Sequence, residues 1–147
     1  MERKLASGGH DGHVRIWDPQ TGKAIGDALR GHTKWITSLA WEPIHMCVSV
    51  LALSQPDCSY SHRNSNPSAP RLASSSKDGT VRVWSLTTRR VEYTLGGHTA
   101  SVNVVKWGGT GGVCGVLYTA SSDRTVRIWD AKKVCIPCVI KPSRSSG

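Results

Sequence analysis

The chain has 147 residues, 38% of them hydrophobic and 20% charged, which is ordinary for a globular domain with its own core and excludes a disordered chain. Lys and Arg number 19 against 10 Asp and Glu, and the net charge of +9 favours acidic or nucleic-acid partners. The longest apolar run, Met46–Leu53, is too short to cross a membrane, and the first residues lack the apolar stretch of a signal peptide. Five cysteines, an odd number, suit a reducing compartment, so we expect a soluble, intracellular protein.

The first predicted unit spans residues 5–29. Its segment LASGGHDGHVRIWD, residues 5–18, places alternating apolar and polar residues after the pair Asp11-Gly12. Alternation with period two is typical of a β-strand, and Asp-Gly is typical of a hairpin turn with positive φ. Trp17 follows Asp11 by six residues.

The second predicted unit spans residues 30–96 and contains a segment that the first unit lacks. It begins with GHTKWITSLAW, residues 31–41, and repeats the hairpin as LASSSKDGTVRVWS, residues 72–85. Strands are predicted near residues 35–41, 71–76, 80–84 and 91–95. Residues 44–70 are rich in Ser, Asn and Pro and are predicted to form an irregular insertion, either functional or foreign to the fold.

The third predicted unit spans residues 97–133. It carries GHTASVNVVKW, residues 97–107, and YTASSDRTVRIWD, residues 118–130. Strands are predicted near residues 101–107, 117–121 and 125–129, with a last strand within 134–140. The turn is Asp123-Arg124 and lacks the glycine, which predicts a more strained turn. Residues 134–147 form a divergent tail.

Three copies of Asp followed six residues later by Trp, two of them preceded by Gly-His, resemble the WD40 repeat of four-stranded propeller blades. The resemblance implies an all-β fold: a WD40 β-propeller fragment of about two and three-quarter four-stranded blades, about eleven strands, that does not form a closed propeller. The unit 5–29 would be a partial blade without its inner strand. Both outer blades would then expose an apolar face, and a longer parent protein is expected.

The resemblance also assigns a structural role to a repeated set of four residues, which in this family form a buried hydrogen-bond chain from indole to hydroxyl, imidazole and carboxylate. The set is His32, Ser74, Asp78 and Trp84 in the second unit, His98, Thr119, Asp123 and Trp129 in the third, and Ser7, Asp11 and Trp17 in the first, where the set lacks its histidine. Ser, His and Asp could also form a catalytic triad. Two copies of the set favour the structural role, so no catalytic residue is expected and the chain is predicted not to be an enzyme.

Other motifs that could carry chemistry are incomplete. Cys135-Ile-Pro-Cys138 has the CxxC spacing of a zinc or redox site, but zinc needs a second ligand pair and a redox motif needs a βαβ context. The glycine-rich residues 108–112 lack the lysine of a phosphate loop. We therefore expect no cofactor, no metal and no small-molecule substrate.

Partner binding in this family uses the narrow face of the propeller, and the resemblance places a set of exposed residues there. The set is Trp35, Thr37, Lys77, His10, Ser101, Asn103 and Ser122. Trp is the side chain that most often dominates binding energy, so Trp35 is the leading candidate. The alternative is that Trp35 packs against a neighbouring blade.

The amino-acid sequence of the repeats is more specific than a general WD40 pattern. KWITSLAWEP, ASSSKDGTVRVW and YTASSDRTVRIWD resemble the Notchless family. Membership implies a scaffold for large ribosomal subunit biogenesis in the nucleus and nucleolus, with other proteins and pre-ribosomal particles including rRNA as partners, and a link to Notch signalling in animals. The alternative is a generic WD40 adaptor, such as a ubiquitin-ligase substrate receptor or a signalling scaffold.

Overall fold

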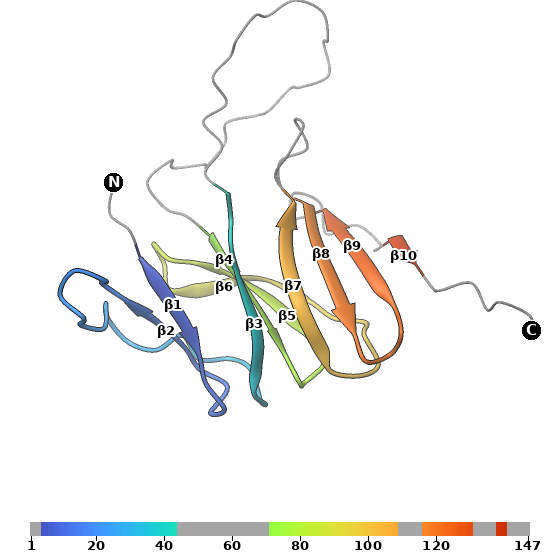
Figure 1. The fold of residues 1–147 in the computed structure, drawn as a ribbon, viewed down its shortest axis with the longest axis horizontal. Coiled ribbons are helices and arrows are strands. Elements are labelled where there is room, and N and C mark those ends of the chain that lie inside the picture. The colour runs from blue at the N-terminus through green and yellow to red at the C-terminus, as the bar shows by residue number, and fades with distance from the viewer. Residues whose placement is uncertain (1–3, 44–70, 109–115, 131–137, 141–147) are drawn as a thin grey trace, which may run out of the picture.

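The computed structural model describes residues 4–43, 71–108, 116–130 and 138–140, and every regular element in these ranges is a β-strand (Figure 1). The strands form three antiparallel sheets, one for each predicted unit. The all-β prediction is confirmed, and the sheets form an open stack rather than a closed ring (Figure 1).

The first sheet contains β1 (Leu5–Gly8) and β2 (Val14–Trp17). The second has the order β3-β4-β5-β6, with β3 at Ile36–Trp41, β4 at Arg71–Ser76, β5 at Val81–Ser85 and β6 at Arg90–Leu95. The third has the order β10-β9-β8-β7, with β7 at Val102–Gly108, β8 at Val116–Ser121, β9 at Val126–Asp130 and β10 at Cys138–Ile140. Each hairpin with an Asp turn therefore joins two neighbouring strands of one sheet.

Two apolar layers hold the three sheets together. Val14 and Ile16 of the first sheet are buried with Leu72 and Trp84 of the second. The opposite face of the second sheet packs on the third, where the buried set is Ala73, Val81, Val83, Leu95, Val102, Val105, Leu117 and Trp129. The alternation along each strand explains this arrangement, because successive side chains point to opposite faces of a sheet.

The backbone of the three Asp turns adopts a positive φ at the residue after the Asp. Gly12 and Gly79 adopt φ of 74° and 83°, and Arg124, at the equivalent position in the third unit, adopts φ of 64°. The prediction of a less favourable turn at Asp123-Arg124 is therefore confirmed, since a side chain at positive φ is disfavoured.

The first unit differs from the predicted pattern. A third strand was expected after β2, but the structure has only two isolated bridges there, Val14 to Leu29 and Trp17 to Ala24. Arg89 from the second unit donates to the carbonyls of Ile25 (2.6 Å) and Asp27 (2.7 Å), so a side chain holds part of this segment in place. The described residues thus contain ten strands, and the insertion 44–70 and most of the tail 134–147 lie outside them.

Candidate functional site

A hydrogen-bonded chain crosses the second sheet. The Trp84 indole Nε1 donates to Ser74 Oγ at 2.8 Å, and Ser74 Oγ lies 2.8 Å from His32 Nε2. His32 Nδ1 lies 2.8 Å from Asp78 Oδ2. Thr80 Oγ1 donates to the other carboxylate oxygen of Asp78 at 2.6 Å. The chain joins β4, β5, the turn between them and the segment before β3.

The protonation states of this chain follow from its surroundings. Burial lowers the pKa of His32 more than the Asp78 carboxylate raises it, so the imidazole is neutral. Burial alone would raise the pKa of Asp78, but hydrogen bonds from Thr80 and His32 lower it from 3.8 to about 2. A neutral His32 can accept from Ser74 through Nε2 and donate to Asp78 through Nδ1, which satisfies every group.

The third sheet repeats this geometry. Trp129 Nε1 donates to Thr119 Oγ1 at 2.9 Å, and His98 lies 2.8 Å from Thr119 Oγ1 and 2.7 Å from Asp123 Oδ2. Thr125 Oγ1 donates to Asp123 at 2.5 Å. Burial would raise the pKa of Asp123, but hydrogen bonds from Thr125 and His98 hold it well below its usual range. Sequence reasoning missed Thr80 and Thr125, although each stands two residues after the turn Asp.

The first sheet has only part of the chain. Trp17 Nε1 donates to Ser7 Oγ at 2.8 Å, as in the other two units. No histidine joins Ser7 to Asp11 among the described residues, and Asp11 instead accepts from Arg15 Nη2 at 2.7 Å and from the His13 backbone N–H at 3.1 Å. These contacts lower the pKa of the exposed Asp11 carboxyl, first through the Arg15 hydrogen bond.

The hydroxyls of the two complete chains cannot act as nucleophiles in this arrangement. Ser74 and Thr119 are buried, and each hydroxyl oxygen already accepts from an indole. A nucleophile must reach a substrate, so the arrangement serves to connect strands. Such a satisfied network avoids the cost of unpaired buried polar groups.

The glycine of each Gly-His pair lies against an arginine that sequence reasoning missed. A Cβ at Gly31 would lie 2.4 Å from Arg82 Nη1, and a Cβ at Gly97 would lie 2.5 Å from Arg127 Nη1. Gly97 also adopts φ of 125°, which disfavours any side chain. Arg82 and Arg127 both stand four residues after the turn Asp, as Arg15 does in the first unit, which was the available signal.

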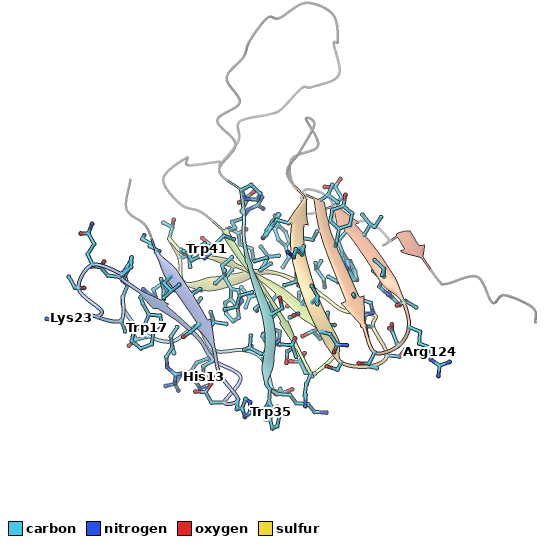
Figure 2. The ribbon with its side chains drawn as sticks, viewed as in Figure 1. His13, Trp17, Lys23, Trp35, Trp41 and Arg124 are labelled. Carbon is cyan, nitrogen blue, oxygen red and sulfur yellow. The ribbon has the colours of Figure 1, made fainter. Side chains whose placement is uncertain are left out.

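Three of the predicted partner-binding residues meet at the edge of the stack that carries the Asp turns. Figure 2 shows Trp35 at this edge, pointing away from the strands. His10 stacks on its ring with centroids 3.8 Å apart and planes 3° apart, and Lys77 Nζ lies 4.0 Å from the ring centroid. Trp35 thus contacts His10 of the neighbouring sheet yet remains 44% exposed.

The other four predicted partner-binding residues are placed differently. Thr37 is half-buried, and its hydroxyl donates to the Val102 carbonyl at 2.5 Å and lies 2.9 Å from Ser75 Oγ, so it links the second and third sheets. Ser101, Asn103 and Ser122 bond to one another beside the third turn, with Asn103 Nδ2 donating to Ser122 Oγ at 3.0 Å. Asn103 and Ser122 are exposed.

Neither a metal site nor a membrane span is found in the described ranges. No group of three or more His, Cys, Asp or Glu residues there could hold a metal ion. No helix in those ranges is long and apolar enough to cross a membrane. Cys135 lies outside the described residues, and the side chain of Cys138 is not described.

Comparisons with known proteins agree on one type of repeat. The family model for the WD domain, G-beta repeat, matches residues 2–18, 23–85 and 89–130. Protein Notchless of Drosophila melanogaster is 40% identical over 113 residues, which cover 77% of this chain and 18% of that protein. Ribosome assembly protein 4 of Saccharomyces cerevisiae is 52% identical over 129 residues, which cover 70% of this chain and 25% of that protein.

A solved structure, that of U3-55K, shares the fold with a TM-score of 0.67 at 22% identity, covering 94% of this chain and 33% of that chain. The chain spans a quarter or less of the length of the two relatives named above.

Proposed function

Because this chain belongs to the WD40-repeat family, with Notchless-type proteins among its relatives, we propose that it is an interaction scaffold in large ribosomal subunit biogenesis. The observation that carries the proposal is the exposed indole of Trp35, held by His10 and Lys77 at the edge of the stack. An indole fixed by its neighbours loses little conformational freedom when it binds, which favours a protein contact.

Charge at this edge supports the choice of partner. Lys34, Lys77 and Arg124 are exposed there, whereas the carboxylates of Asp78 and Asp123 are almost fully buried by their hydrogen-bonded partners. The remaining acid, Asp11, pairs with Arg15. The surface is therefore positive and suits a partner rich in acidic groups or phosphate, and pre-ribosomal particles contain both protein and rRNA.

We infer no catalytic role for the chain, and we propose that it works in the nucleus and nucleolus. The similarity to proteins named for ribosome assembly supports this location. The two His–Asp pairs connect strands instead of facing a substrate.

The test follows a tagged copy of the chain in sucrose gradients of cell extract. The chain should co-sediment with large-subunit precursors, and Trp35→Ala combined with Lys77→Glu should release it into the light fractions. Raising the salt should mimic the loss of Lys77 but not that of Trp35. Exposed charges are screened over about 8 Å at physiological ionic strength, whereas burial of an indole is mainly apolar.

Lys23→Glu is the matched control, because Lys23 is exposed and lies away from Trp35 (Figure 2). Circular dichroism should show that all variants keep the wild-type fold. Full co-sedimentation of the folded double variant would rule out this edge as the contact, and a wild-type chain that never enters precursor fractions would rule out the ribosomal role.

A further inference from the structure

The exposed indole at the edge with the Asp turns is held in place by backbone and ring contacts. The Lys77 N–H donates to the Trp35 carbonyl at 3.0 Å, and the Ile36 N–H donates to the Gly9 carbonyl at 3.1 Å. His10 stacks on the ring with the two centroids 3.8 Å apart. The second sheet is packed on both of its faces, so the exposure of Trp35 belongs to this edge of the stack. A rigid anchor of this kind favours contact with a protein.

The third sheet carries neutral polar side chains at the equivalent positions. The Ser122 N–H donates to the Ser101 carbonyl at 2.9 Å, as Lys77 does to Trp35. Asn103 is exposed, and its Nδ2 donates to Ser122 Oγ at 3.0 Å. An amide nitrogen carries two hydrogens, so the second one can be donated to a backbone carbonyl of a partner.

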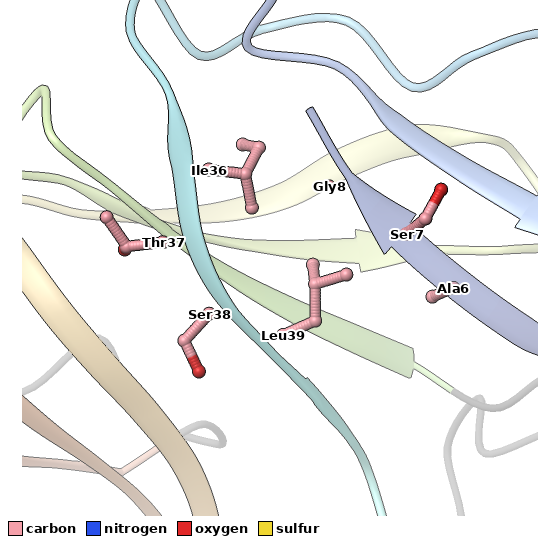
Figure 3. A pocket seen from close by; sticks show the side chains of 7 residues that line it. All are labelled: Ala6, Ser7, Gly8, Ile36, Thr37, Ser38 and Leu39. Atoms are coloured by element: carbon pink, nitrogen blue, oxygen red, sulfur yellow. The ribbon is translucent and has the colours of Figure 1, made fainter. Parts of the chain in front are cut away.

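These two groups lie on neighbouring strands of different sheets. Figure 3 shows Ile36 on the side of β3 that faces β1 and Thr37 on the opposite side. The Thr37 hydroxyl donates to the Val102 carbonyl at 2.5 Å, which places the start of β3 beside the start of β7. Facing sheets lie about 10 Å apart, and an extended chain advances about 3.3 Å per residue. An extended segment of a partner therefore spans both groups with about three residues.

Positive charge at this edge is concentrated beside the exposed indole. In the second unit the exposed Lys34 and Lys77 outnumber the ionised carboxylate of Asp78. In the third unit the exposed Arg124 is balanced by the ionised carboxylate of Asp123. A nucleic acid carries charge on every nucleotide and is bound by cations along its path. An excess of positive charge at one point, followed by neutral side chains, instead fits a peptide with an acidic residue.

We infer that this edge binds an extended acidic segment of a protein partner. A Glu or Asp side chain of the segment pairs with Lys77, whose Nζ lies 4.0 Å from the Trp35 ring centroid, and packs against the electropositive rim of that indole. A backbone carbonyl about three residues away accepts from Asn103. The inference rests on the proposed role of this edge as a contact surface and adds the chemistry of the partner.

The experiment offers three pools of short peptides to the purified, immobilised chain. The peptides have Glu, Gln or Lys at the central position and random residues elsewhere. The chain should retain the Glu pool about tenfold or more above the Lys pool, because like charges brought together at a contact are strongly disfavoured. Lys77→Glu should remove this preference. Lys23→Glu reverses an exposed charge away from Trp35 and should leave the preference unchanged (Figure 2).

A single retained peptide, labelled for fluorescence anisotropy, tests the other two contacts. Trp35→Ala should weaken its binding about tenfold or more, as for an anchor residue. Asn103→Ala should weaken it roughly three- to tenfold, the range of a net hydrogen-bond contribution. Trp35, Lys77 and Asn103 are exposed, so the variants should keep the fold, which circular dichroism checks.

Three outcomes would overturn the inference. They are equal retention of the Glu and Lys pools, a preference for Glu that survives Lys77→Glu, and a uridine oligomer that binds more tightly than the retained peptide and is released by Trp35→Ala. The measurements use purified components, so they are independent of the ribosomal role. A chain that selects Glu peptides but never enters precursor fractions would refute that role alone. A chain that enters those fractions without selecting Glu peptides would refute the acidic partner alone.

Discussion

At the scale of single residues, the buried hydrogen-bond chain of the second sheet depends on a neutral His32. Ser74 accepts from the Trp84 indole, so its own hydroxyl proton is free to be donated to His32 Nε2. A protonated imidazole would place two donors against one another at that contact. Burial lowers the pKa of His32 and prevents this at neutral pH. Acid therefore destabilises the folded state relative to the unfolded state.

Acid should reduce the free energy of unfolding in two stages. The pKa of His32 is lowered in the folded state. Below about pH 6.5 the imidazole is therefore protonated more readily in the unfolded chain, and the free energy of unfolding falls. Asp78 has its pKa lowered from 3.8 to about 2, so its contribution is complete above about pH 4 and is lost as the pH falls toward 2. Urea unfolding followed by Trp fluorescence at several pH values should show both declines.

Asp11→Asn is the control for this pH dependence. Asp11 is exposed and solvent screens its contact with Arg15, so the variant should keep the wild-type profile. A stability that stays constant from pH 8 to pH 3 would show that the buried pair of His32 and Asp78 does not titrate as the geometry requires.

At the scale of elements, the same type of hairpin occurs three times with different neighbouring segments. The hairpins β1–β2, β4–β5 and β8–β9 share an Asp turn, a hydroxyl and a Trp. In the second and third units a His from the segment before the inner strand fills the space beside the Asp. In the first unit Ser7 and Asp11 are exposed, and Trp17 is half-buried. The local sequence forms the hairpin, and the neighbouring segment decides how much of it is buried.

This difference predicts unequal costs for the same substitution. Asp78→Ala would leave His32, Thr80 and the Thr33 N–H without their acceptor and should lower the free energy of unfolding by about 2–3 kcal/mol. Asp11→Ala removes an exposed contact that solvent screens and should have a much smaller effect. Chemical denaturation of the two variants gives the comparison, and a loss at Asp78 no larger than that at Asp11 would refute the buried network.

Sequence predicts the hairpins well because their signals are local. Alternation and the Asp turns located β4, β5, β8 and β9 to within a residue or two, and the equivalent turn positions have positive φ as expected. The stacking of His10 on Trp35 and the contact of Arg82 with Gly31 join residues of different segments. Such contacts depend on how the sheets pack, which no local pattern specifies. A strand after β2 was expected only because the resemblance implies four-stranded blades, and the structure forms isolated bridges there.

At the scale of the whole molecule, each sheet of the stack is buried on the side where a neighbour exists. Ala73 and Val81 of the second sheet are fully buried under the third. The equivalent residues of the third sheet, Tyr118 and Val126, are 43% and 39% exposed. The repeats are alike in sequence, so the difference comes from position in the stack. Repeat units of this kind bury their faces only against neighbours.

The final prediction compares these equivalent positions directly. Val81→Ala removes two methyl groups from a fully buried site and should lower the free energy of unfolding by about 2 kcal/mol. Val126→Ala removes the same atoms from a partly exposed site and should cost less than about 0.5 kcal/mol. Chemical denaturation at several chain concentrations measures both losses. If Val126→Ala costs as much as Val81→Ala, the outer face of the third sheet is covered in solution. A cost that grows with chain concentration would then identify a second copy of the chain as the cover, because association stabilises by mass action.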